Sequence, residues 1–173
     1  MYPNEYIQFL AHFHGDRDYF ECHEILEDYW KKTDPSNKDS IWVGLIQVAV
    51  SAYHHRRGNY NGAKRTLEKA IRILRIQEAE VISLGLDHLP FQILLNDRLS
   101  LIEKGEVYQS FNLPICDPFL LKLGKSFCEH HGYEWGQKSD LTNRSLVDRH
   151  TLRDRTEVIE ERIQSLKMRK GSE

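Results

Sequence analysis

The segment from Ile41 to Tyr53 constrains the fold of this chain more than any other feature, because it is almost entirely apolar. It forms the centre of residues 38–57, whose length and residue pattern predict a single helix. A helix that is apolar on nearly every face must be surrounded by other elements, because a surface helix needs a polar side. We therefore expect a central buried helix with neighbouring helices packed around it.

Apolar residues at helical spacing predict three further helices close to the central one. Two precede it, over residues 5–14 and 18–32, and one follows it, from Asn59 to about residue 80. Gly58 suits the left-handed position that ends a helix, and Asn59 suits the N-cap of the next helix. Consecutive helices would then pair into two stacked hairpins. The sequence thus predicts an all-α fold with a four-helix core.

The second half of the chain carries a weaker pattern. Its predicted helices cover residues 90–104, 116–131 and 145–170. Between the first two, residues 107–114 are expected to be extended or a loop and could hold a short strand. We divide the chain into a helical-hairpin core over residues 1–84 and a mostly helical extension over residues 85–173, which ends in a long charged helix.

The last predicted helix carries apolar residues at alternating spacings of four and three. This seam consists of Leu152, Thr156, Ile159, Ile163 and Leu166. It spans only about two heptads, which is short for a coiled coil. The simpler interpretation is a helix docked on its own domain by one stripe. The alternative is a helix that binds a protein partner or a second copy through Leu152, Ile159, Ile163 and Leu166.

The overall composition excludes several classes of protein. The 24 Lys and Arg residues against 26 Asp and Glu residues leave a net charge of −2, without the basic excess typical of a nucleic-acid binder. No apolar run approaches the roughly 18 residues that a membrane span needs. The N-terminal residues show no signal-peptide pattern. Three dispersed cysteines argue against a disulfide framework, so we expect a cytoplasmic protein without nucleic-acid or membrane partners.

The candidate site is a group of polar residues on two helices that are expected to be neighbours. The group comprises His23, Glu24, Glu27 and Trp30 on the helix over residues 18–32, and Gln47, Ser51, His54 and Asn59 on or just after the central helix. Spacings of three, four and seven residues place such side chains on one helical face. Because they border apolar stripes, we expect them to meet between the helices.

Three interpretations of this group stay open. The favoured one is a buried polar network that fixes helix packing, with Glu27 accepting hydrogen bonds from His54 or Gln47. The second is a pocket for a small molecule or peptide. The third is a metal site of His23, Glu27 and His54, although one His–Glu pair at this spacing is a weak signal for a metal. We therefore expect no cofactor, with a divalent metal as the alternative.

Other polar clusters carry less information. The segment Cys128–His131 has only Cys116 as a nearby thiol, which is too few ligands for a zinc site. His55–Arg57 adds positive charge at the end of the central helix, where the helix dipole favours cations. The motifs for a nucleophilic serine, a phosphate-binding glycine loop and a dinucleotide site are absent from the sequence.

Several blocks of the first half resemble a known family in order and spacing. The blocks are Tyr19–Trp30, Gly44–Val50, Tyr53–His54, Gly58–Asn59 and Gly62–Ala63. Over residues 13–76 the chain resembles the bacterial domain-of-unknown-function family three hundred and nine, and its length and Phe111–Ile115 resemble the longer Bacillus-type members. The resemblance implies a core of helical hairpins and no particular activity. The signature positions here are His23, Glu24, Glu27, Trp30, Gly44, Gln47, His54, Gly58 and Asn59.

The sequence supports two hypotheses about function. The first is a non-enzymatic binding or scaffold protein, because helical hairpins offer grooves and no catalytic motif is present. The alternative is a small enzyme, such as a metal-assisted hydrolase, that uses His23, Glu24, Glu27 and His54. In that enzyme, either His54 or Glu27 would be the general base.

Overall fold

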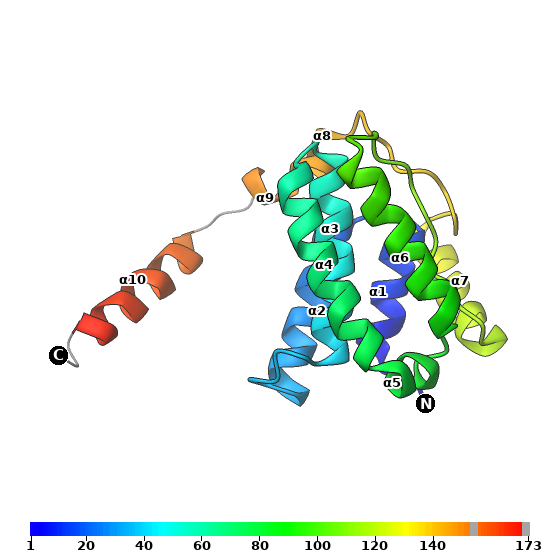
Figure 1. The fold of residues 1–173 in the computed structure, drawn as a ribbon, viewed down its shortest axis with the longest axis horizontal. Helices are drawn as coiled ribbons and strands as arrows, with labels where there is room; N and C mark the ends of the chain where they lie inside the picture. Colours follow the sequence, from blue (N-terminus) through cyan, green and yellow to red (C-terminus); the bar gives the residue numbers. More distant parts are fainter. Residues whose placement is uncertain (153–155, 171–173) are drawn as a thin grey trace.

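The computed structural model describes residues 1–152 and 156–170, and these residues form an all-α structure (Figure 1). The helices in chain order are α1 (Asn4–His14), α2 (Tyr19–Thr33), α3 (Ile41–Arg56), α4 (Tyr60–Ile76), α5 (Glu78–Ser83), α6 (His88–Glu103), α7 (Pro118–His131), α8 (Arg144–Val147), α9 (Arg149–Leu152) and α10 (Thr156–Lys170). Within the described ranges no strand forms, and a single antiparallel bridge joins Leu86 to Ile115. The all-α prediction is confirmed.

The central helix α3 lies between α2 and α4, as its apolar composition requires (Figure 1). Ser40 caps its start by accepting a hydrogen bond from the Trp42 N–H. At its end, Gly58 adopts a left-handed conformation with a φ of 76°. Asn59 then caps α4, because its Oδ1 accepts a hydrogen bond from the Gly62 N–H at 3.0 Å. The predicted turn between α3 and α4 is therefore confirmed.

The remaining helices pack around this arrangement. Helix α1 pairs with α2, α3 pairs with α4, and α2 packs on α3, so that the first four helices form two stacked hairpins. Helix α6 covers α4, and α7 covers α1. One hydrophobic core joins these layers, and it includes Phe91, Leu95 and Leu120 from beyond residue 84. The domain boundary at residue 84 stays a prediction, but the two sides share this core.

The predicted long helix over residues 145–170 is wrong in its first part. Helix α8 ends at Val147, because Asp148 has a backbone φ of −112° and leaves the helical path. The Asp148 carboxylate contacts Arg57, which follows α3, and Arg144 of α8, and these contacts tie the turn to the bundle. Two short helices therefore precede α10. Residues 107–114 form no strand either.

Helix α10 stands apart from the bundle in Figure 1. Its apolar side chains Ile159, Ile163 and Leu166 are exposed to 53%, 45% and 57%. The stripe is thus not docked on the bundle, contrary to the simpler of the two interpretations of the sequence. The side chains of Leu152 and Thr156, which extend the predicted seam, lie outside the described part of the structure.

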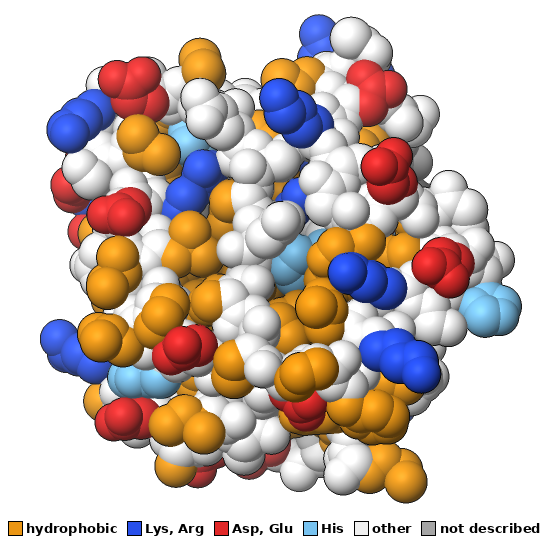
Figure 2. Space-filling view, turned by 90° about the vertical axis from the view of Figure 1, so that its right-hand side faces the viewer, with side chains coloured by type: hydrophobic (Ala, Val, Ile, Leu, Met, Phe, Trp, Pro, Cys, Tyr) orange, Lys and Arg blue, Asp and Glu red, His pale blue; other side chains and the backbone are white. Residues whose placement is uncertain are grey.

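The described helices are all too short or too polar to cross a lipid bilayer. Figure 2 shows the side of the bundle on which α6 and α7 lie. The hydrophobic side chains on this face have charged side chains of both signs spread around them. This face therefore carries no uniform charge.

We predict that Gly44→Leu destabilises the bundle. A Cβ atom at Gly44 would lie 2.8 Å from Leu74 Cδ2 and 3.1 Å from Ile73 Cγ2, so α3 and α4 approach too closely for a larger side chain. Overpacking of this kind costs about 1–3 kcal/mol. Chemical denaturation would measure the loss, with the exposed Lys69→Leu on α4 as the control. Equal stability of both variants and the parent chain would contradict this close packing.

Candidate functional site

The His23 cluster, which consists of His23, Glu24 and Glu27, lies half-buried on α2. Asp18 caps this helix by accepting a hydrogen bond from the Glu21 N–H. Since Tyr19, Cys22 and Leu26 face the core, the His23 cluster occupies the adjoining side of the helix.

The imidazole of His23 lies between the two carboxylates of the cluster. Its Nδ1 is 3.3 Å from Glu24 Oε1, and its Nε2 is 3.2 Å from Glu27 Oε2. Lys31, one turn further along, places its Nζ 3.2 Å from Glu27 Oε1. About a third of each side chain in the cluster is exposed, so these charges remain in contact with solvent.

The geometry of the cluster is compatible with a metal ion. One donor atom from each of His23, Glu24 and Glu27 lies within 4.8 Å of the other two. An imidazole nitrogen with carboxylate oxygens is a ligand set used for Zn²⁺ and Mn²⁺. One metal ion can bind only one nitrogen of the His23 ring. Metal binding would therefore replace one of the two contacts that His23 makes with Glu24 and Glu27. His54 does not belong to this group.

The polar residues of α3 make separate contacts. Half-buried Gln47 has no hydrogen bond to Glu27 or His54 within the described residues. His54 Nδ1 lies 3.2 Å from Asn59 Nδ2, at the turn into α4. The buried Ser51 donates to the carbonyl oxygen of Ala63, which ties α3 to α4.

Trp30 is also engaged locally, because its indole Nε1 donates to the carbonyl oxygen of Asn37 at 3.0 Å. In the part of the chain that the structure describes, the expected hydrogen bonds from His54 or Gln47 to Glu27 do not form, and Glu27 contacts His23 and Lys31. The eight predicted residues divide into the His23 cluster and several local contacts.

Aromatic rings connect His23 to His54. The ring of Phe20 lies 6.0 Å from those of both His23 and Tyr53, and the Tyr53 ring lies 6.2 Å from that of His54. The Tyr53 hydroxyl also contacts Nδ1 of His150 in α9, at 2.5 Å. The two histidines thus border one aromatic patch. Burial, together with nearby cations such as Arg57, lowers the pKa of His54, which favours its neutral form.

Three arginines form a second polar centre that the sequence patterns did not single out. Arg17, Arg56 and Arg98 are only 1%, 8% and 6% exposed. Within the described residues, no ion pair joins any of them to a carboxylate. Their positive charges are instead held by neutral groups, which is an unusual use of buried arginine.

Arg17 attaches the segments after α6 and after α7 to the bundle, and Arg56 attaches the segment after α7. Arg17 donates to the carbonyl oxygens of Phe13, Phe111 and Gln137 and to Asn112 Oδ1. Arg56 donates to the carbonyl oxygen of Arg17 and to Ser139 Oγ, and its guanidinium lies 4.6 Å from the centre of the Tyr19 ring. The hydrogen bonds of these two arginines therefore connect residues more than 80 positions apart in the sequence.

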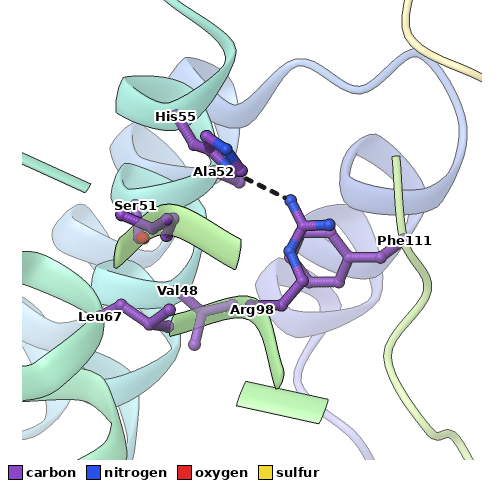
Figure 3. Close-up of a pocket in the computed structure, with 8 residues that line it drawn as sticks. Val48, Ser51, Ala52, His55, Leu67, Arg98 and Phe111 are labelled. Carbon is purple, nitrogen blue, oxygen red and sulfur yellow. Dashed lines mark hydrogen bonds between the residues drawn. The ribbon is translucent and has the colours of Figure 1, made fainter. Parts of the chain in front are cut away.

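Arg98 of α6 makes the equivalent contact with α3. Its Nη2 lies 3.1 Å from His55 Nδ1, and its guanidinium stacks 4.2 Å from the centre of the Phe111 ring. Figure 3 shows the Arg98–His55 pair at a cavity of about 10 Å³, which Ser51 and Leu67 also line. A cavity of this size holds about one water molecule. The pair therefore serves packing rather than ligand binding.

The interpretation of His55–Arg57 as a charged helix end is wrong for its first two residues. His55 and Arg56 are both buried. The segment after α6 covers His55, whereas the turn before α2 and the segment after α7 cover Arg56. A signal was present in the sequence, since these residues lie four positions after the buried Ser51 and Ala52 and so continue buried stripes. That spacing does not show which segments of the chain pack against the end of α3.

The buried His14 side chain attaches the segment after α6 to α1. Its Nδ1 donates to the carbonyl oxygen of Leu10, and its Nε2 accepts a hydrogen bond from the Leu113 N–H at 2.9 Å. Trp135 stacks on the ring with a centroid distance of 4.3 Å. This arrangement requires the neutral imidazole, and burial lowers the pKa of His14 to about 3.

Two comparisons with known proteins bear on the family. A model of the family described as a domain of unknown function, DUF309, matches residues 6–66. The chain is also 48% identical over 172 residues to a Bacillus subtilis (strain 168) protein named "Uncharacterized protein YpuF", and the match covers 99% of both chains. The chain belongs to the DUF309 family. No solved structure matches it.

The DUF309 match covers α1, α2, α3 and the start of α4. It therefore contains the His23 cluster, Gly44 and the turn at Asn59. Arg98 and His150 lie beyond it, in the part of the chain that the full-length match to the B. subtilis relative covers.

We predict that His14 makes the fold sensitive to acid. An unfolded histidine has a pKa near 6.5, whereas that of the folded His14 is about 3. Because the unfolded state binds a proton first, His14 contributes stability that is present above pH 6.5 and is lost as the pH falls towards 3. Between pH 7.5 and pH 5 the loss amounts to about 2 kcal/mol.

Urea denaturation of the parent chain and of His14→Gln across this pH range tests the prediction. The variant is expected to be less stable at pH 7.5, and the stability difference should shrink by about 2 kcal/mol at pH 5. Other titrating groups contribute equally to both proteins. A difference that is independent of pH would show that His14 does not stay neutral.

Proposed function

We propose that this protein is a non-enzymatic helical binding protein that associates with a second copy of itself through α10. The single observation that carries the proposal is the exposed apolar stripe of Ile159, Ile163 and Leu166. These residues repeat at spacings of four and three, which is the spacing of helices that pair along a seam. A stripe of this kind gains stability when another apolar surface covers it.

A second copy is the occupant that the residues of α10 favour. The seam is apolar along its described length, so two copies present matching surfaces around a two-fold axis. The seam is flanked by Glu160, Arg162 and Lys167. Because these residues carry charges of both signs, two α10 helices can pair in arrangements in which the flanking charges do not repel each other. Because α10 supplies only about two heptads, the association should be weak and dependent on protein concentration.

We also propose that the protein is cytoplasmic. Cys22, Cys116 and Cys128 are all free thiols, and Cys22 and Cys128 are buried. Free cysteines without disulfides are typical of proteins in reducing compartments.

Sedimentation equilibrium of the full chain over a wide concentration range tests the association. The parent chain is expected to shift from monomer to dimer as its concentration rises, whereas Ile163→Glu should stay monomeric. Glu161→Gln changes the outer face of the same helix and should behave like the parent. A parent chain that remains monomeric throughout, or an Ile163→Glu variant that still dimerises, would overturn the proposal.

The geometry of the His23 cluster favours a second candidate, a metal-assisted enzyme. His23, Glu24 and Glu27 could supply three ligands and leave coordination positions for water and substrate. His54 borders the same aromatic patch and has a lowered pKa, so its neutral ring suits a general base. Against this candidate, Lys31 competes with a metal for Glu27.

Calorimetric titration of untagged protein with Zn²⁺ and with Mn²⁺ tests the metal site. Binding of one ion per chain is expected, and His23→Ala should weaken it at least tenfold, because this variant loses the nitrogen ligand. His130→Ala, which removes an exposed histidine on α7, is the matched control. Absence of stoichiometric binding, or equal binding by both variants, would rule out this second candidate.

A further inference from the structure

A pocket of about 350 Å³ lies between the segment after α6 and the segment before α8. We call it the Ser110–Ser139 pocket; its lining residues are Tyr108, Gln109, Ser110, Lys138, Ser139 and Leu141. The Ser139 N–H donates to Ser110 Oγ at 2.8 Å, which joins the two walls. Its volume is within the usual range of small-molecule sites.

The two serine hydroxyls in the wall are arranged as donors. Ser110 Oγ accepts one hydrogen bond from the Tyr108 hydroxyl and another from the Ser139 N–H. Both of its acceptor positions are therefore occupied, and the hydroxyl hydrogen is what it can offer to a ligand. Ser139 Oγ accepts from Arg56 Nη1 at 3.0 Å, so this charge-assisted bond polarises the second hydroxyl in the same direction.

Positive charge is concentrated at this pocket. Lys138 is the one charged side chain among the residues that line it. Arg56 lies directly behind Ser139, and its buried Nε has no hydrogen-bond partner. The neighbouring Asp140 turns its carboxylate to the Thr142 N–H and hydroxyl and is absent from the lining.

The other two buried arginines contact residues at or next to the pocket. Arg17 Nε donates to the carbonyl oxygen of Gln137, immediately before Lys138. The Arg98 guanidinium lies 5.7 Å from the centre of the Tyr108 ring. Within the described residues, none of the three arginines has a carboxylate partner, so no direct ion pair there neutralises their charge.

We infer that the Ser110–Ser139 pocket binds a small organic anion through a phosphate or carboxylate group. Lys138 and the two serine hydroxyls would donate to the anionic oxygens, and the buried Arg56 would strengthen the Ser139 bond. An anion here would also supply the negative charge that the buried arginines lack. The inference is independent of α10 and of the His23 cluster.

NMR titration of the isotope-labelled full chain tests the inference, with inorganic phosphate and acetate as separate probes at constant ionic strength set by chloride. Saturable shifts of the Ser110, Lys138 and Ser139 amides are expected with at least one probe. Saturation with phosphate alone identifies a phosphate group as the ligand chemistry, and saturation with acetate alone identifies a carboxylate. Equal, non-saturable shifts with both probes would overturn the inference.

Variants separate direct binding from a loss of structure. Lys138→Ala and Ser139→Ala should each weaken anion binding at least fivefold, whereas Ser139→Thr keeps the hydroxyl and should restore most of it. Lys125→Ala on exposed α7 is the control for charge and should bind like the parent. If Ser139→Ala and Lys138→Ala bind as tightly as the parent, the pocket is not an anion site.

Discussion

The burial of α3 is the constraint on which the rest of the structure depends. A helix that is apolar on nearly all faces loses stability if any face meets water, so it must be enclosed. Helices α2 and α4 cover two of its sides, and the close approach at Gly44 lets α4 pack directly against it. The segments after α6 and after α7 cover its end, where His55 and Arg56 are buried.

Enclosing the end of α3 creates the second distinctive feature, a set of buried arginines. Arg17, Arg56 and Arg98 reach from the bundle to the irregular segments that follow α6 and α7. Carbonyl groups and aromatic rings hold these cations in place of carboxylates, and they attach segments that have few apolar residues of their own. The same arrangement places the positive charge of Arg56 next to Ser139, which lines the pocket. Arg56 therefore has both a structural role and a candidate role in binding.

The two candidate sites differ in how far they could be predicted. The His23 cluster lies within one helix, so the spacing of His23 and Glu27 alone places their side chains together. The expected network with Gln47 and His54 required the relative rotation of α2 and α3, which spacing does not determine. The arginine centre joins residues from distant parts of the chain, and its members look like ordinary surface charges in the sequence.

The sequence by itself determined the all-α class, the central position of α3 and the turn at Gly58 and Asn59. These features follow from apolar periodicity and from local backbone chemistry, which act over a few residues. Only the tertiary structure decided that α10 stands apart from the bundle, that His55 and Arg56 are buried, and that Ser110 meets Ser139. The burial of His55 and Arg56 and the meeting of Ser110 with Ser139 depend on contacts between segments far apart in the chain, and no local pattern specifies which partner a side chain will meet.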